Sequence, residues 1–176
     1  ELASSVPGLP QAEPSLKITY VQPKDFTGLL RYVRNILVVT IDPTAYTKVS
    51  VGYENNVWAR GQVVVSLKAP NTESIVEYSK THEKALVNFF VKVEMNRAIE
   101  QLQKEYSMVV MDNLKSDLNV MLNAPANFTY YKDTTDFFWS SNNANTGRMD
   151  LIVYTFPYTD PNTFTEEYLV AKRDSV

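Results

Sequence analysis

Apolar residues recur every three or four positions along residues 72–106, and this spacing predicts the longest helix of the chain. Asn71 or Thr72 can cap its beginning. A straight helix of about 34 residues would be about 51 Å long, whereas a domain of this size is about 40 Å across. Because the apolar spacing also shifts after Val93, we expect a bend or break near residues 92–96.

Before this helix, shorter patterns alternate between strand and helix. They predict a strand, a short helix and two further strands, over residues 16–21, 25–34, 36–41 and 57–67. In Ile36–Ile41, the side chains that would point to either face of a strand are apolar, as in a strand that is covered on both faces. We therefore expect this strand to be the central one of its sheet.

After the long helix, another short helix is expected over Ser107–Asp117. After this helix, the spacing of apolar residues changes from every three or four positions to every second position. This change predicts an antiparallel meander of three strands, over residues 128–131, 137–140 and 149–156. Thr163 with Glu166 three residues later matches a capping box, so a last helix is expected to run to about Arg173.

This order of elements predicts an α+β fold. Helices would pack on one side of a largely antiparallel sheet, and the first part would be similar to a split β-α-β, or ferredoxin-like, unit. A length of 176 residues suits one domain, so we expect residues 1–176 to form a single α+β domain. Three prolines and a glycine among the first fourteen residues favour an extended lead-in.

Charge and composition exclude several classes of function. The chain carries 17 basic and 20 acidic residues, a net charge of −3, so we expect no nucleic-acid partner. It has no cysteine, which excludes disulfides and thiolate chemistry. No apolar run reaches the roughly 18 residues of a membrane-spanning helix, and the start ELASSVPGLPQAEP lacks the pattern of a signal peptide.

No motif for a metal or a cofactor is found in the sequence. His82 is the single histidine, which excludes a two-histidine metal site or a histidine-paired nucleophile within this chain, and its place in the apolar stripe predicts packing. The five glycines are isolated, which excludes a phosphate-binding glycine loop. We therefore expect no cofactor, no metal and no catalytic residue that the sequence can name.

Acidic residues come in local pairs, Asp133 with Asp136 and Glu166 with Glu167. A glycosidase needs two carboxyl groups facing each other at roughly 5 to 10 Å. The first pair lies in a predicted turn and the second at a predicted helix start, where acids are favoured for structural reasons.

Aromatic residues make up 12% of the chain, including 11 tyrosines and 2 tryptophans. Most of them must belong to the core. Rings with a polar edge are also typical of interfaces and of surfaces that stack on sugars. The candidate binding residues are Trp58, Arg60, Trp139, Tyr154 and Tyr158.

Three stretches of the chain resemble a known group of proteins. They are VPGLPQAEPSLKITYVQPKDFTGLLRYVRNILVVTID, VEMNRAIEQL and YTFPYTDPNTFTEEYLVAKRDS, and the turn from Asp160 to Phe164 is the most specific part. These stretches resemble an uncharacterised domain family of predicted lipoproteins from Bacteroidetes. The resemblance implies a cell-envelope location, with a signal peptide and a lipid-bearing cysteine upstream. It also implies that residues 1–176 are a domain trimmed at one or both ends, and it carries over no activity.

Two functions are expected from these observations. The first is a non-enzymatic domain of a cell-envelope lipoprotein, periplasmic or attached to the outer membrane, with a binding or structural role toward a protein or glycan. Its contact with the membrane would be through the upstream lipid anchor. The alternative is a carboxylate-dependent enzyme acting on carbohydrate, with Asp133, Asp136 or Asp160 involved. Two or more convergent carboxylates in a cleft would favour the enzyme, and a shallow surface with exposed rings would favour the binder.

Overall fold

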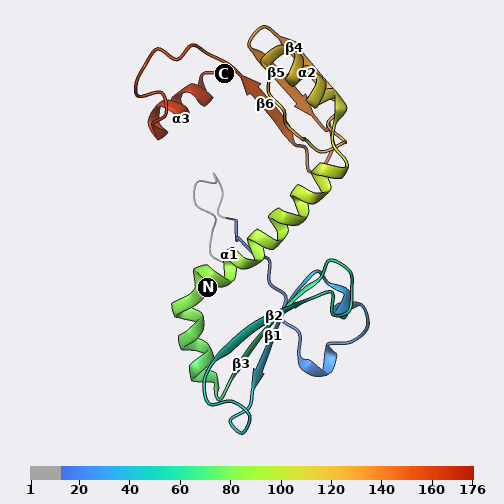
Figure 1. The fold of residues 1–176 in the computed structure, drawn as a ribbon, viewed down its shortest axis with the longest axis vertical. Helices are drawn as coiled ribbons and strands as arrows, with labels where there is room; N and C mark the ends of the chain where they lie inside the picture. The colour runs from blue at the N-terminus through green and yellow to red at the C-terminus, as the bar shows by residue number, and fades with distance from the viewer. Residues whose placement is uncertain (1–12) are drawn as a thin grey trace. The chain divides into compact units, whose positions relative to one another are not determined.

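The computed structural model describes residues 13–176, so most of the expected proline-rich lead-in lies outside the described residues. The chain divides into two compact units, Glu1–Ala98 (unit 1) and Ile99–Val176 (unit 2). Each unit has its own three-stranded sheet (Figure 1). The expectation of a single domain over residues 1–176 stays a prediction.

Unit 1 contains a sheet of β1 (Asn35–Ile41), β2 (Ser50–Asn55) and β3 (Val63–Ala69), in the order β1-β3-β2. β3 runs parallel to β1 and antiparallel to β2. β3 is the central strand, and five of its seven residues are buried. The prediction that residues 36–41 form the central strand is therefore wrong, because β1 lies at an edge with Val39 and Ile41 each 47% exposed.

The segment before β1 differs from its prediction. Residues 17–22 form no strand, and the expected helix over residues 25–34 is replaced by two 3₁₀ helices, η1 (Pro23–Asp25) and η2 (Gly28–Tyr32). Gly28 has a φ of 53°, a left-handed conformation that interrupts a continuous α-helix. Since residues 17–22 form no strand and residues 25–34 no α-helix, the first part does not form the expected split β-α-β unit.

Helix α1 (Thr72–Lys104) follows β3, and the boundary between the two units falls within it. The Asn71 side chain accepts a hydrogen bond from the N–H of Ser74 at 2.9 Å, as expected of a cap. Phe90 packs with Val63 and Val65 of β3 to form the core of unit 1.

The long helix is bent, but not at the expected residues 92–96. The non-helical residue is His82, with φ −116° and ψ 17°. Its ring is exposed and stacks on Tyr78 at 4.1 Å, and its Nδ1 lies 3.1 Å from the Tyr78 carbonyl. His82 therefore packs on an aromatic ring at the exposed surface of the helix. The sequence had instead predicted that it packs within the apolar stripe.

Unit 2 contains helix α2 (Met108–Leu118) and a meander of β4 (Tyr130–Thr134), β5 (Phe137–Ser141) and β6 (Asp150–Tyr154). Both strand pairs are antiparallel, which confirms the predicted meander. The core joins α2 to one face of this sheet and contains residues Val110, Leu114, Ala124, Phe128 and Phe138, with Leu118, Leu151 and Val153 packed against it. Figure 1 shows α2 lying along the sheet.

The last helix, α3 (Glu166–Asp174), begins two residues later than expected. Its cap is Thr165, whose Oγ1 accepts from the N–H of Tyr168 at 3.3 Å. Thr163, the predicted cap, is 3% exposed and donates its hydroxyl to the carbonyl of Asp160 at 2.6 Å. Thr163 thus fixes the turn that precedes the helix.

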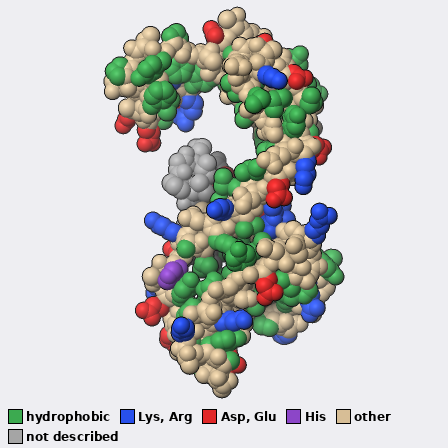
Figure 2. Space-filling view, viewed as in Figure 1, with side chains coloured by type: hydrophobic (Ala, Val, Ile, Leu, Met, Phe, Trp, Pro, Cys, Tyr) green, Lys and Arg blue, Asp and Glu red, His purple; other side chains and the backbone are tan. Residues whose placement is uncertain are grey.

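Together these elements confirm an α+β fold with mostly antiparallel strands. Within residues 13–176, no helix is both long enough and apolar enough to cross a membrane. Figure 2 shows basic and acidic side chains interspersed over the visible face, in keeping with the net charge of −3.

Candidate functional site

One face of the β4-β5-β6 sheet packs on α2, and the opposite face carries rings and polar groups. Side chains alternate between the faces of a strand, and residues directly opposite on paired strands share a face. The register places Lys132 and Ile152 on either side of Trp139, and Thr134 and Tyr154 on either side of Phe137. We call this surface the open face; its members are Tyr130, Lys132, Thr134, Phe137, Trp139, Ser141, Asp150, Ile152 and Tyr154.

The open face is a mixed and partly accessible surface, in which Ser141 is fully buried. Tyr130 is 55% exposed and Ile152 is 50% exposed, while Trp139 and Tyr154 are partly buried. The predicted site residues Trp139 and Tyr154 therefore lie on one face of neighbouring strands, as a diagonal pair.

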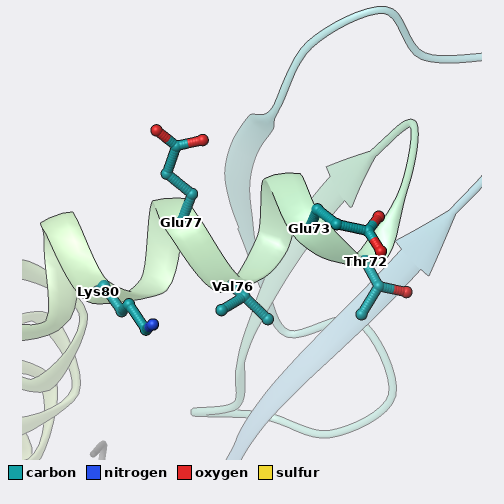
Figure 3. Close-up of a pocket in the computed structure, with 5 residues that line it drawn as sticks. All are labelled: Thr72, Glu73, Val76, Glu77 and Lys80. Atoms are coloured by element: carbon teal, nitrogen blue, oxygen red, sulfur yellow. The ribbon is translucent and has the colours of Figure 1, made fainter.

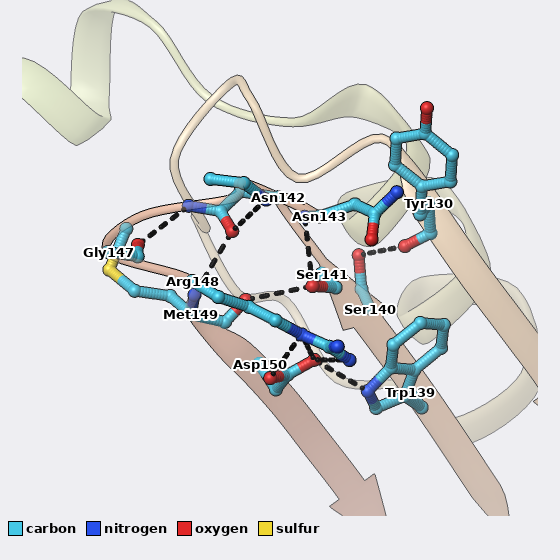
Figure 4. A network of polar contacts seen from close by, with 11 residues as sticks. Tyr130, Trp139, Ser140, Ser141, Asn142, Asn143, Gly147, Arg148, Met149 and Asp150 are labelled. Carbon is cyan, nitrogen blue, oxygen red and sulfur yellow. Dashed lines mark hydrogen bonds and ion pairs between the residues drawn. The ribbon is translucent and has the colours of Figure 1, made fainter.

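A polar network fixes the position of Trp139 (Figure 4). The indole Nε1–H donates to Oδ1 of Asp150 at 3.1 Å. Asp150 also accepts from Arg148: Nη2 donates to Oδ1 at 3.0 Å, and Nε donates to Oδ2 at 3.0 Å and to Oδ1 at 3.2 Å. The Arg148 guanidinium, with smaller contributions from Ser141 and Trp139, holds the pKa of Asp150 below its usual value. At neutral pH the carboxylate is therefore ionised and holds both the indole and the guanidinium.

The turn between β5 and β6 places Arg148 and Asp150. Oδ1 of Asn142 accepts from the N–H of Met149 at 3.0 Å, and Oγ of Ser141 donates to the Met149 carbonyl at 3.1 Å. Gly147 has a φ of 65°, which a glycine adopts without strain. Sequence reasoning missed Arg148 and Asp150, although an acid and a base two residues apart beside a glycine turn are a usable signal for such a pair.

Beyond β6 the chain carries further rings. Phe156 lies 6.0 Å from Tyr154 and 6.3 Å from Tyr168 of α3, and Nζ of Lys172 lies 4.7 Å from the Phe156 ring. The predicted site residue Tyr158 is 65% exposed and faces Phe164 at 5.5 Å. Tyr158 therefore belongs to a separate exposed pair in the segment between β6 and α3.

The other two predicted site residues belong to unit 1. Trp58 and Arg60 lie in the turn between β2 and β3, and both are exposed. The Trp58 ring packs edge-on against Phe26 at 5.6 Å. Both belong to unit 1 and are therefore no part of the open face.

The three carboxylates of the enzyme alternative have local structural partners. Asp136 accepts from the Thr155 hydroxyl at 3.0 Å, and Asp160 accepts from the N–H of Asn162 at 2.8 Å. Asp133 lies beside Asp117 of α2, and this contact, together with desolvation and charge repulsion, raises the pKa of Asp133. No group of three or more metal-ligating side chains occurs in the part of the chain that the structure describes.

Two surface hollows lie in unit 1. One of about 360 Å³ is lined by Thr72, Glu73, Val76, Glu77 and Lys80. All five residues come from the start of α1, and Glu77 points to the side opposite Val76 and Lys80 (Figure 3). The other, of about 200 Å³, lies between β2 and α1, with Tyr53 and Phe89 among its lining residues. The first hollow is lined by two acids, Glu73 and Glu77, and neither hollow is lined by Asp133, Asp136 or Asp160 of the enzyme alternative.

Comparison with protein families divides the chain close to the boundary between its units. Residues 1–103 match the family described as Domain of unknown function (DUF8532), and residues 107–176 match Domain of unknown function (DUF4837). Searches of the curated proteins and of the solved structures gave no match. The expectation of an uncharacterised domain family is thereby confirmed, while the lipoprotein character and the bacterial origin belong to the proposal below. By the match over more than half of its length, this chain belongs to the family described as Domain of unknown function (DUF8532).

Proposed function

We propose that this chain is a non-enzymatic binding domain of a cell-envelope lipoprotein, and that the open face of unit 2 binds a glycan. The observation that carries the proposal is the fixed position of Trp139. Its ring lies between Lys132 and Ile152 on a sheet face opposite the one that α2 covers. Its N–H is held by Asp150, which Arg148 holds in turn.

A fixed indole on an accessible sheet face is suited to binding. Ordering a side chain on binding costs free energy, and a ring that is already held in place avoids part of that cost. The Asp150–Arg148 pair is exposed, so its contribution to stability is small. Its clearest effect is to orient the ring.

A glycan is favoured by the mixture of groups on this face. The C–H faces of a sugar ring stack on aromatic rings, and its hydroxyls need donors and acceptors beside them. The open face offers Trp139 and Tyr154 for stacking, and Lys132, Thr134 and Asp150 for hydrogen bonds. A purely apolar partner would take the Lys132 ammonium out of water without giving it a hydrogen bond in return.

The envelope location is supported by the resemblance of three stretches to predicted lipoproteins. A signal peptide and a lipid-bearing cysteine upstream would attach the protein to a membrane, and the net charge of −3 disfavours nucleic acid as a partner. Labelling cells with a fatty acid, and finding the label on the full-length protein, would test the anchor. Its absence from the protein would contradict this part of the proposal.

Affinity electrophoresis through gels that contain soluble glycans tests the binding. We expect at least one envelope or extracellular polysaccharide to retard the chain, and Trp139→Ala to weaken this binding by at least about tenfold. Met121→Ala is a matched control, because Met121 is 75% exposed in unit 2 and lies outside the open face. Its mobility should follow that of the wild type.

Two results would contradict the proposal. One is equal retardation of the wild type and Trp139→Ala while both remain folded, which would place the ligand elsewhere. The other is shortening of the glycan during incubation with the chain, abolished in Asp133→Asn, which would favour the carboxylate-dependent enzyme.

A further inference from the structure

Unit 1 exposes an unusual group of apolar side chains in two neighbouring segments, residues 23–34 and the turn of residues 55–62. We call these two segments the tip. Leu29 is 86% exposed, Tyr32 is 60% exposed and Trp58 is 38% exposed. Single exposed apolar residues are common, so the tip is informative only if its segments are held together.

Gln62 holds the two segments together. Its side chain is 1% exposed, and its Nε2 donates to the carbonyls of Arg31 at 2.6 Å and Val33 at 2.7 Å. Its Oε1 accepts from the N–H of Trp58 at 3.0 Å. The contact between Phe26 and Trp58 at 5.6 Å is a second link.

The geometry of η2 directs two of the exposed side chains to one side. Residues three apart eclipse each other in a 3₁₀ helix, so Leu29 and Tyr32 share a face. The tip thus presents an aliphatic and an aromatic side chain together on a segment that Gln62 fixes.

The charge of the tip is opposite to that of the whole chain. Its two segments contain four basic residues, Lys24, Arg31, Arg34 and Arg60, against the single acid Asp25, a local charge of +3 in a chain of net charge −3. Arg34 lies 3.5 Å from Glu94. The other three basic residues take part in none of the ion pairs formed within residues 13–176.

We propose that the tip docks on the surface of an anionic lipid bilayer. Apolar and aromatic side chains insert at the level of the headgroups, while lysine and arginine contact anionic lipids around them. A fixed tip with a positive charge fits this surface. The inference rests on unit 1 and is independent of glycan binding by unit 2.

Sedimentation with vesicles tests the docking. We expect the chain to bind vesicles of phosphatidylcholine with about one third phosphatidylglycerol, and to bind pure phosphatidylcholine at least about fivefold more weakly. Binding should fall at about 0.5 M salt because screening weakens the contacts with the headgroups. In Trp139→Phe, Trp58 is the only tryptophan, and its emission should shift to shorter wavelength on anionic vesicles.

Variants of exposed residues distinguish docking from loss of folding. Leu29→Ser with Tyr32→Ser should reduce vesicle binding about tenfold or more. Arg31→Glu with Arg60→Glu should reduce it by at least about fivefold per residue. Ile99→Ser is the matched control, because Ile99 is 49% exposed and belongs to unit 2.

Three outcomes would overturn the proposal. They are the absence of vesicle binding, binding that these variants leave unchanged, and binding to neutral vesicles as strong as to anionic ones. Self-association that Leu29→Ser abolishes, without vesicle binding, would assign the tip to a contact between copies of the chain.

Discussion

At the scale of single residues, the sequence identified rings but not their partners. Trp139 and Tyr154 were candidates because amphipathic rings suit surfaces, yet the alternation of strands was needed to show that they share a face. The role of Asp150 could be identified only from the strand register. The register places Asp150 opposite Ser141, where its carboxylate accepts from the Trp139 indole. Such roles depend on cross-strand pairing, and a local pattern does not contain this information.

Asp133 is the residue where acidity and stability are most directly linked. Its contact with Asp117 raises its pKa, whereas the pKa of Asp117 is lowered, chiefly by the Ser116 hydroxyl. The raised pKa means that the folded state favours the protonated form of Asp133. The contribution of Asp133 to the stability of the fold is therefore present at low pH and is lost as the pH rises through the pKa of the folded state. At neutral pH the negative charges of Asp133 and Asp117 repel each other.

Asp133→Asn should therefore stabilise unit 2 at neutral pH. We expect Tm to rise by about 1–3 °C at pH 7, and the gain to vanish near pH 3, where Asp133 of the wild type is protonated. Thermal unfolding at both pH values measures this. Asp112→Asn, an exposed change on α2, is the control, and an equal gain at both pH values would exclude the charge as its cause.

At the scale of elements, local patterns predicted α2 and the meander well. Both have strong periodicity and clear ends, and Ser107 begins α2 as expected. β2 was missed because all six of its residues are exposed, so no buried alternation marks it. The sequence predicted β1 as the central strand because its continuous apolar residues resemble those of a strand covered on both faces. Such a sequence does not show the order of the strands in the sheet, in which β3 is central.

The bend of α1 was expected for a sound reason but at the wrong residue. A straight helix of this length would be longer than a single domain, and the apolar spacing shifts after Val93, so a bend was expected there. The structure places it at His82, which stacks on Tyr78. Stacking between neighbouring turns is a specific contact that hydrophobic spacing does not reveal.

Ser107 links α2 to the loop before β4. Its Oγ accepts from the N–H of Val110 at 3.3 Å and donates to the Phe128 carbonyl at 2.5 Å, and the residue is 3% exposed. Ser107→Ala should lower the free energy of unfolding by about 2 kcal/mol, because it removes a cap and leaves a buried carbonyl unpaired. Urea unfolding measures the loss, and Ser116→Ala, at an exposed serine of the same helix, should cost much less. Equal losses would argue against the cap.

At the scale of the whole molecule, each unit has its own core. One is centred on Val63, Val65 and Phe90, and the other on Leu114 and Phe138 among others. The two family matches meet between residues 103 and 107, close to the boundary between the units. Sequence reasoning expected a single domain from length alone, and length does not show how many cores a chain forms.

Core truncation tests the single-domain expectation. Leu114→Ala should destabilise unit 2 by about 2–5 kcal/mol. If residues 1–176 unfold as one domain, the urea transitions reported by Trp58 in unit 1 and Trp139 in unit 2 shift together. A shift of the Trp139 transition alone would show two independently folding domains.

The central claim is that a ligand binds on the open face at Trp139, and the most direct measurement is the fluorescence of Trp139 during titration with the retarding glycan. In Trp58→Phe, Trp139 is the only tryptophan of the chain. We expect its emission to change saturably with the glycan, and the bound ligand to protect it from quenching by acrylamide. Unchanged emission and unchanged quenching, at glycan concentrations that saturate binding, would show that the ligand does not contact Trp139 and would contradict the account.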